Sequence, residues 1–305
     1  MRTANKKTVS IIGAGRVGST LTMLLFRAGY RIVSVISRHQ TSARKLARLV
    51  QCPQYSNSLS DVHPATRIIC IAVPEENILG IAEEISKSVH IDFSKLAVFH
   101  TSGSLSSDAL LPLRKKMALT FSLHPIQSFS KSSSLARQLD QMQQCVYGFE
   151  GEKAAIPIAR QLVKSLQGVF VTIPKEEKFL YHIASVFASN YSVALLGVVD
   201  DVVKRIGGEL TLAHFKPLVR TSIENAFQQT PVQALTGPIA RGSFASVKNQ
   251  LQKLQNIDPS LAVLYQNIGL QALKMAETRN SMKPKIAKQI RQILESSITI
   301  DKEKH

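Results

Sequence analysis

The sequence predicts an α/β fold with a doubly wound, mostly parallel sheet, followed by an all-helical region. The first two-thirds of the 305 residues alternate short apolar runs with amphipathic stretches. Strand–helix alternation with short turns is typical of a parallel sheet covered by helices on both faces. A glycine-rich turn follows the first apolar run, and strand signals cease after Pro174.

Seven short runs rich in Val, Ile and Phe predict the strands, because continuous apolar runs suit strands buried on both faces. They are Thr8–Ile12, Ile32–Ile36, Ile68–Val73, Leu96–His100, Leu119–Leu123, Val146–Phe149 and Val169–Ile173. Between the first two strands, Val17, Leu21, Leu24 and Ala28 keep helical spacing. Gly29 is positioned to end that helix.

After Pro174 the pattern predicts helices only. A long helix is expected from Lys175 to about Arg205, ended by Gly207 and Gly208. Further helices are expected over Leu212–Gln229, Val247–Gln255, Pro259–Thr278 and Lys285–Ser297, with a loop over Pro231–Gly242 and a frayed end at 301–305. We therefore expect two domains, the sheet domain at 1–173 and the helical domain at 174–305.

The charge is strongly positive, since 38 Lys and Arg face 21 Asp and Glu, a formal net charge of +17. Residues 1–50 hold ten basic side chains and no acidic one, and the first acid is Asp61. A polyanion, an anionic membrane or a phosphorylated small molecule would fit this segment, as would a basic bias without local meaning. The apolar content of 44% supports full cores and excludes wholesale disorder.

Several classes of protein are disfavoured. The three cysteines show no CxxC spacing, which argues against a disulfide framework or a cysteine-rich zinc site and suits a reducing, cytoplasmic location. No uninterrupted apolar run reaches the ~18 residues of a membrane span, so no membrane partner is expected. Neither a DNA- or RNA-binding motif nor an HxH or HExxH pair is found, so no nucleic acid and no metal is expected.

A GxGxxG pattern joins the first predicted strand to the first predicted helix, which is the context of a dinucleotide site. Gly13 allows the tight turn, Gly15 lets the backbone approach a pyrophosphate, and Gly18 lets helix and strand pack closely. Arg16 and Val17 open the helix, whose N-terminus favours phosphate. The pattern predicts a Rossmann dinucleotide site, and a purely structural turn is the alternative.

The end of the second predicted strand favours NADP over NAD. NAD sites usually place an acid there to hold the ribose 2′-hydroxyl, but no acid precedes Asp61. Ser37 can donate to a phosphate oxygen, and Arg38 can pair with a 2′-phosphate. The alternative is that Arg38 is a solvated surface residue.

Residues at the ends of later strands are expected near the same cleft. Ala72, Val73 and Pro74 would form a wall along the dinucleotide, and Thr101 and Ser102 follow the next strand. The carboxyl edge of an open parallel sheet is where ligands bind. His100 and His124 also end strands, and for each a structural role is as open as contact with substrate.

A polar stripe runs along the long predicted helix. Lys178, His182, Ser185 and Ser189 follow the spacing i, i+4, i+7 and i+11, and Asn190 borders them. The stripe is either exposed surface or the lining of a cleft between domains. In a cleft, Lys178 or His182 would supply a proton and Asn190 would orient a carbonyl.

Six sequence blocks in this order carry a resemblance to a family. They are IIGAGRVGST, IAVPEENI, HTSGSLSSDAL, SLHPIQSF, KFLYHIASVFASNY and ALTGPIARGS. The chain resembles the Rossmann-like proteins with a DUF2520 C-terminal domain, a branch of the 6-phosphogluconate dehydrogenase-like reductases. The resemblance implies an NADP-binding sheet domain, a helical domain that mediates a homodimer, and a cleft between them.

The function implied is NADPH-dependent reduction of a small 2-oxo acid to a 2-hydroxy acid. The most specific expectation is ketopantoate to pantoate in pantothenate biosynthesis. Lys178, His182 and Asn190 would be catalytic, with His124, Ser189 and Arg241 toward the substrate; Arg241 could instead cap a helix. A non-catalytic NADP-binding sensor or scaffold is the alternative.

Overall fold

The computed structural model describes residues 7–130, 132–279 and 282–296. The expected helix end at Ser297, the tail 301–305, and the basic residues Arg2 and Lys6 lie outside the described residues.

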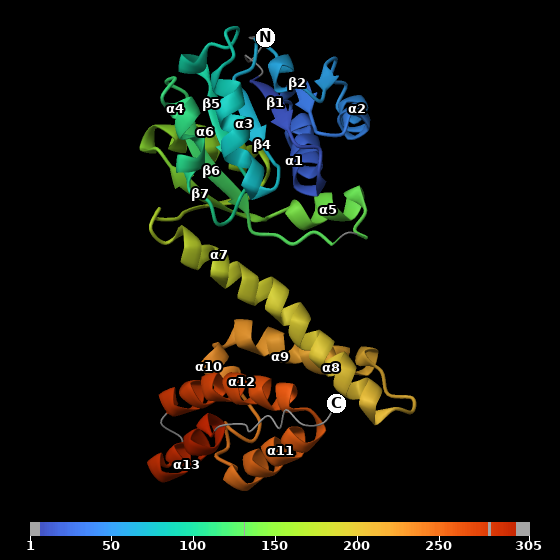
Figure 1. Ribbon diagram of the computed structural model, residues 1–305, viewed down its shortest axis with the longest axis vertical. Helices are drawn as coiled ribbons and strands as arrows, with labels where there is room; N and C mark the ends of the chain where they lie inside the picture. Colours follow the sequence, from blue (N-terminus) through green and yellow to red (C-terminus); the bar gives the residue numbers. More distant parts are fainter. Residues whose placement is uncertain (1–6, 131, 280–281, 297–305) are drawn as a thin grey trace, which may run out of the picture. The chain divides into compact units, whose positions relative to one another are not determined.

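Eight strands form one sheet in the order β3-β2-β1-β4-β5-β6-β7-β8 (Figure 1). All neighbouring strands are parallel except β6 and β7, which run antiparallel. The strands are β1 Thr8–Ile12, β2 Arg31–Ile36, β3 Tyr55–Ser56, β4 Ile68–Ile71, β5 Ala97–His100, β6 Leu119–Pro125, β7 Val146–Gly151 and β8 Val169–Thr172. The doubly wound, mostly parallel sheet is confirmed.

Each of the seven predicted strands is present, with ends that differ by up to two residues. The additional strand β3 is two residues long and pairs with β2 through Tyr55 and Ser56. A pair of residues is too short to give a periodic signal, so the sequence pattern did not reveal it. β4 ends at Ile71, which leaves Ala72 and Val73 in the turn beyond the sheet edge.

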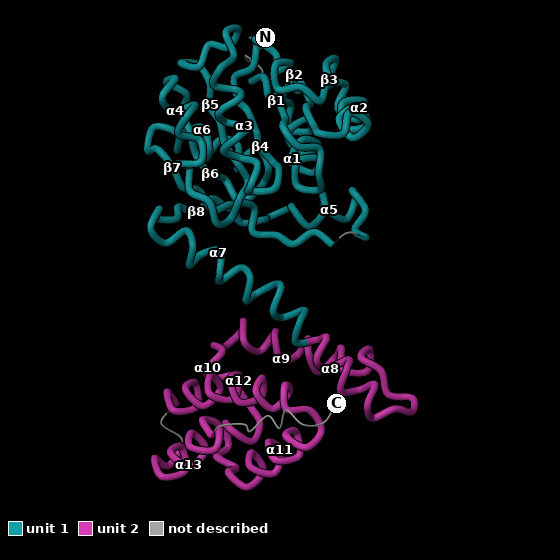
Figure 2. Tube along the Cα trace, viewed as in Figure 1, with its two compact units in different colours: residues 1–195 teal, residues 196–305 magenta. Residues whose placement is uncertain are grey.

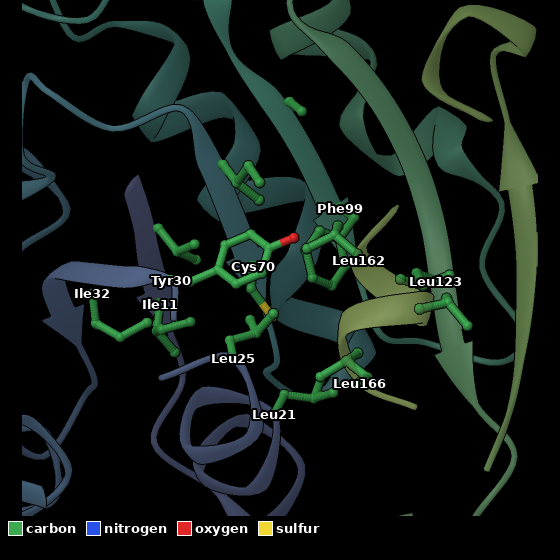
Figure 3. Close-up of a cluster of buried hydrophobic side chains, with 14 of the residues drawn as sticks. Ile11, Leu21, Leu25, Tyr30, Ile32, Cys70, Phe99, Leu123, Leu162 and Leu166 are labelled. Atoms are coloured by element: carbon green, nitrogen blue, oxygen red, sulfur yellow. The ribbon is translucent and has the colours of Figure 1, made fainter. Parts of the chain in front are cut away.

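Helices cover both faces of the sheet. They are α1 Arg16–Arg27, α2 Gln40–Leu49, α3 Ile78–Ser86, α4 Leu111–Arg114, α5 Leu135–Met142 and α6 Ile156–Ser165. One apolar layer contains buried side chains of α1, α2 and α6, and the other contains those of α3 and α4. Figure 3 shows the first layer, where Leu21 and Leu25 of α1 lie beside Tyr30, Cys70 and Phe99.

The long helix predicted after Pro174 is continuous from Lys178 to Ile206. It consists of α7 Lys178–Val186, a π-helical turn over Phe187–Tyr191, and α8 Ser192–Ile206. Gly207 and Gly208 follow with φ of +73° and +71°, as expected for glycines that end a helix. The π turn was not predicted, because it inserts a residue without breaking the apolar pattern.

This helix is also long and apolar enough to cross a membrane, judged by length and composition, with a mean hydropathy of 1.5 in its most apolar window. The finding corrects our expectation that no such stretch exists. That expectation counted uninterrupted apolar runs only, whereas a window average stays high when a few polar residues such as Ser185 and Asn190 interrupt an otherwise apolar helix. None of the window is buried in the chain.

The chain divides into two compact units, residues 1–195 and 196–305 (Figure 2). The second unit holds α9 Lys216–Gln228, α10 Pro231–Ala234, α11 Phe244–Ile257, α12 Pro259–Thr278 and α13 Pro284–Glu295. Its apolar core gathers Ile239, Val247, Leu273, Ile290 and Leu294. The segment expected as a loop, 231–242, contains the short α10.

Candidate functional site

The glycine-rich turn has the geometry that the sequence predicts. Gly13 has φ of +105°, and a Cβ there would lie 2.2 Å from the carbonyl oxygen of Ala72. A Cβ on Gly18 would lie 1.9 Å from the carbonyl oxygen of Gly13. A Cβ on Gly15 would meet nothing within 4 Å, so this position faces open space, where a ligand can approach the backbone.

A pocket of about 350 Å³ opens at this turn. Helix α1 begins there without a side-chain cap on Gly15, which leaves N–H groups and the positive end of the helix dipole for an anion. The pocket is lined by Gly15, Arg16, Val17, Ala72, Val73, Pro74, Thr101, Gln127 and Phe129. The structure thus brings seven predicted cofactor residues together and adds Gln127 and Phe129, which belong to the block SLHPIQSF but were not predicted to contact the cofactor.

The end of β2 carries Ser37, which is half-buried, and Arg38, which is exposed. The amide of Ser37 donates to the carbonyl of Ser56 at 3.0 Å. The hydroxyl of Ser56 in turn donates to the carboxylate of Asp61. The first acid of the chain therefore lies one strand away from Ser37, with its carboxylate engaged by a neighbouring hydroxyl.

Ser102 does not line the pocket, because its hydroxyl donates to Oε2 of Glu75 at 2.9 Å. The hydroxyl of Ser104 donates to the same oxygen. These hydrogen bonds, that from Ser104 first, lower the pKa of the Glu75 carboxyl. Ser102 therefore fixes the loop after β5.

Lys178 begins α7 and is buried, with a relative exposure of 2%. Its Nζ donates to the main-chain carbonyls of Ser102 at 3.2 Å and Gly103 at 3.1 Å. Burial lowers the pKa of this amine to about 8. Lys178 thus joins α7 to the loop after β5, and it is not among the residues that line either pocket.

A cluster of aromatic and imidazole groups surrounds Gly103. Nδ1 of His124 and the hydroxyl of Tyr181 are 2.8 Å apart, and the ring centres of His124 and His182 are 6.3 Å apart. A Cβ on Gly103 would lie 2.6 Å from Nδ1 of His182 and 3.0 Å from Nε2 of His124. Burial, and then the positive charge of Lys178, lower the pKa of His124 to about 3. His124 is therefore neutral at physiological pH.

His182 has one buried ring nitrogen and one accessible one. Nδ1 is buried and has no hydrogen-bond partner among the described residues. The residue itself is partly exposed, so Nε2 is the nitrogen that can meet a ligand. A histidine held in this way can act as a proton donor or acceptor.

Apart from Lys178, the residues of the polar stripe line a cavity of about 620 Å³. All of its walls come from residues before 195, that is, from one unit. The lining residues are His124, Ile126, Gln127, Ser128, Ser130, Arg137, Gln141, His182, Ser185, Val186, Ala188, Ser189, Asn190, Ser192 and Val193. The π turn supplies Ala188, Ser189 and Asn190, and π turns are frequent at functional sites.

Gln127 lines both the glycine-turn pocket and this cavity. Its side chain is held from two sides, since Nε2 donates to the carbonyl of Gln141 at 2.9 Å and Oε1 accepts from the amide of Ser128 at 2.8 Å. The two spaces therefore adjoin at a fixed residue.

Two other candidates lie elsewhere. His100 is fully buried, with Nε2 3.1 Å from the carbonyl of Ser106, and burial lowers its pKa to about 4; it caps the strand end. Arg241 belongs to the 196–305 unit, is exposed, and does not line the cavity. Across the described residues, no three His, Cys, Asp or Glu side chains gather as metal ligands.

Two family models match the chain. A Rossmann-like domain covers residues 1–125, and the domain of unknown function DUF2520 covers residues 145–272. A comparison with curated proteins gives no match.

Solved structures with the same fold span nearly the whole chain. A Bacteroides fragilis protein assigned as an NADP oxidoreductase is 22% identical, with a TM-score of 0.71 and coverage of 88% of this chain and 98% of its own. Protein TM1727 of Thermotoga maritima is 26% identical, with a TM-score of 0.71 and coverage of 89% and 99%. An imine reductase of Myxococcus stipitatus, solved with NADP+, is 16% identical, with a TM-score of 0.61 and coverage of 88% and 94%.

The Rossmann-like match covers the glycine turn and strands β1 to β6, and the TM-scores show that these structures share the fold of the chain. The chain thus combines a region that matches the Rossmann-like family model with a region that matches the DUF2520 model.

Proposed function

We propose that the protein is an NADPH-dependent oxidoreductase that reduces a small 2-oxo acid to a 2-hydroxy acid. The observation that carries the proposal is the meeting of two spaces at Gln127: a pocket at the dinucleotide-type glycine turn, and a cavity lined by His124, His182 and a polar helix face. A reductase needs these two spaces side by side, because hydride passes directly from cofactor to substrate.

The residues present fit NADP. Gly15 leaves room for a pyrophosphate, and the uncapped N-terminus of α1 would hold its charge. Ser37 and Arg38 would contact the 2′-phosphate. Two structural neighbours support this assignment: the Bacteroides fragilis protein assigned as an NADP oxidoreductase and the imine reductase solved with NADP+.

NADPH, when bound, would supply the hydride that adds to the carbonyl carbon. His182 would deliver a proton from Nε2 to the carbonyl oxygen, so that NADPH, a proton and the 2-oxo acid give NADP+ and the 2-hydroxy acid. Asn190 would orient the carbonyl, and Ser189 and His124 would contact the substrate. His182 would regain its proton from solvent through the open cavity.

Lys178 was expected among the catalytic residues. Its buried amine donates to two main-chain carbonyls, and the residue does not line the cavity. We therefore assign it the role of holding the loop that carries Gly103 against α7, and we assign proton donation to His182.

The most specific substrate in this proposal is ketopantoate, reduced to pantoate in pantothenate biosynthesis. The cavity of about 620 Å³ suits a molecule of this size. The support for this choice beyond size is the family resemblance.

The test is a fluorescence titration with NADPH and NADH, followed by an assay of NADPH oxidation with a panel of 2-oxo acids, including ketopantoate, and of imines. We expect tighter binding of NADPH and turnover with at least one 2-oxo acid. His182→Gln should lower kcat by about 10²-fold or more and leave NADPH affinity unchanged. Saturable NADPH binding without turnover on the whole panel would favour the sensor or scaffold instead.

The apolar surface of the long helix supports a homodimer in the same proposal. Phe179, Leu180 and Phe187 are 65%, 59% and 60% exposed, and apolar patches of this kind mark interaction sites. Leu180→Glu should convert the dimer to a monomer in light scattering. Val89→Glu, at a position that is 99% exposed and lies outside the long helix, is the control.

The three free cysteines are buried, which fits the cytoplasmic location in this proposal. A wild-type protein that is monomeric in light scattering and co-sediments with lipid vesicles would refute both the dimer and the cytoplasmic location.

A further inference from the structure

In the described part of the chain, the cavity of about 620 Å³ beside the glycine turn is lined by a cationic side chain and by no acidic one. Among the described residues, its lining includes Arg137 and the two histidines but no Asp or Glu. A cavity with a permanent cation and no carboxylate favours an anionic ligand.

Arg137 lies on α5 with its charge available. In the described part of the chain it forms no ion pair with a carboxylate. Gln141 is one helical turn further on and lines the same cavity, so one face of α5 forms this wall. A guanidinium presents donors in a planar fork that matches a carboxylate.

Arg137 is exposed where it lines the cavity, and the helix that carries it, α5, is held in place. On its other face, Leu139 and Met142 are buried, and Met142 belongs to the sheet core. The hydroxyl of Thr20, buried in α1, donates to Oε1 of Gln138 at 3.1 Å, and α5 packs beside α1 (Figure 1). The helix that lines the cavity is thus attached to the helix that begins at the glycine turn.

A second hydrogen bond, in addition to that between Thr20 and Gln138, holds α5 in place. The side chain of Gln127 donates to the carbonyl of Gln141, the last turn of α5, and Gln127 also lines the glycine-turn pocket. Both hydrogen bonds join α5 to elements of that pocket. They set the position of the helix that carries Arg137 relative to the predicted cofactor.

We propose that Arg137 is the specificity-determining residue that binds the carboxylate of the substrate, in place of the predicted Arg241. The proposal rests on the proposed reductase function and adds the residue that selects an anionic substrate. Arg241 does not line this cavity.

The test compares Arg137→Ala, Arg137→Lys and the control Arg241→Ala in the NADPH oxidation assay. The substrates are an active 2-oxo acid and its methyl ester. Arg137→Ala should raise KM for the acid by about 10- to 100-fold, with little change for the ester. Arg137→Lys should recover part of the loss, because charge remains but the fork does not. An equal change for acid and ester, or a larger effect from Arg241→Ala, overturns the assignment.

A binding measurement separates this inference from the proposed function. Oxamate, a non-reducible analogue of a 2-oxo acid, is titrated calorimetrically into the wild-type protein saturated with NADPH. If no carbonyl is reduced but oxamate binds and Arg137→Ala abolishes binding, the reductase function fails and the anion site stands. If 2-oxo acids are reduced and Arg137→Ala binds oxamate as wild type does, only the role of Arg137 fails. Absence of oxamate binding by the wild type refutes the anion site.

Discussion

Replacing Gly103 by alanine tests the imidazole cluster without removing any functional group. The added Cβ would lie 2.6 Å from Nδ1 of His182 and 3.0 Å from Cε1 and Nε2 of His124. Ordinary contacts between such atoms are about 3.5–4.0 Å, so the His182 ring must move by about 1 Å. A misplacement of that size costs about 10²-fold in rate. We expect kcat to fall by roughly this factor while the NADPH dissociation constant stays the same.

The matched control is Gly80→Ala in α3, where the new Cβ would meet nothing within 4 Å. Both variants are assayed for NADPH oxidation and NADPH binding, and their imidazole signals are followed by NMR. The signals of His124 and His182 should shift in Gly103→Ala only. The reasoning is refuted if Gly103→Ala retains kcat within about twofold with unmoved imidazole signals. The reasoning is also refuted if Gly103→Ala weakens NADPH binding by the same factor as it lowers kcat, since the effect would then lie in the pocket at the glycine turn.

Three further predictions concern the cofactor and pH. Arg38→Ala should weaken NADPH binding about 10- to 100-fold and leave NADH binding unchanged, measured by fluorescence titration; equal losses for both cofactors contradict the role of Arg38. His124, with a folded-state pKa of about 3, is neutral in the fold and charges on unfolding below pH ~6.5. Between pH 7 and pH 5 the free energy of unfolding of the wild type, measured with urea, should therefore fall by about 2 kcal/mol relative to that of His124→Gln. The same pH dependence of stability in both proteins would contradict this. Lys178, with a folded-state pKa of about 8, loses its proton in the fold before it does so in the unfolded chain. Between pH 8 and pH 10 the free energy of unfolding of the wild type should rise by about 2 kcal/mol relative to that of Lys178→Met. If it does not rise, Lys178 is solvated.

The sequence was sufficient for the strands, the glycine turn and the long helix, because each has a local cause. Buried parallel strands are continuous apolar runs, and helix α12 begins at Pro259 and ends at Thr278 as its pattern predicts. The pocket at the glycine turn was predictable for the same reason, since the residues at the carboxyl ends of parallel strands meet at one edge. Strand β3 and the π turn were missed, because two residues or one inserted residue carry no periodic signal.

The cavity was only half predictable. Helical spacing placed Lys178, His182 and Ser189 on one face, but it could not show that Lys178 turns onto two carbonyls while the others line a cavity. Arg137 was not found at all. The apolar spacing of Leu135, Leu139 and Met142 would have indicated an amphipathic helix there, but not what its polar face meets.

The sequence by itself determined seven of the eight strands, the alternation of strands and helices along the chain, and the residues of the glycine turn, because these depend on neighbours along the chain. The tertiary structure decided which polar groups meet. Gly103, His124 and His182 come from three elements, and α5 reaches the cavity because Thr20 and Gln127 hold it there. Contacts between residues far apart in the chain depend on packing, so no local pattern specifies them.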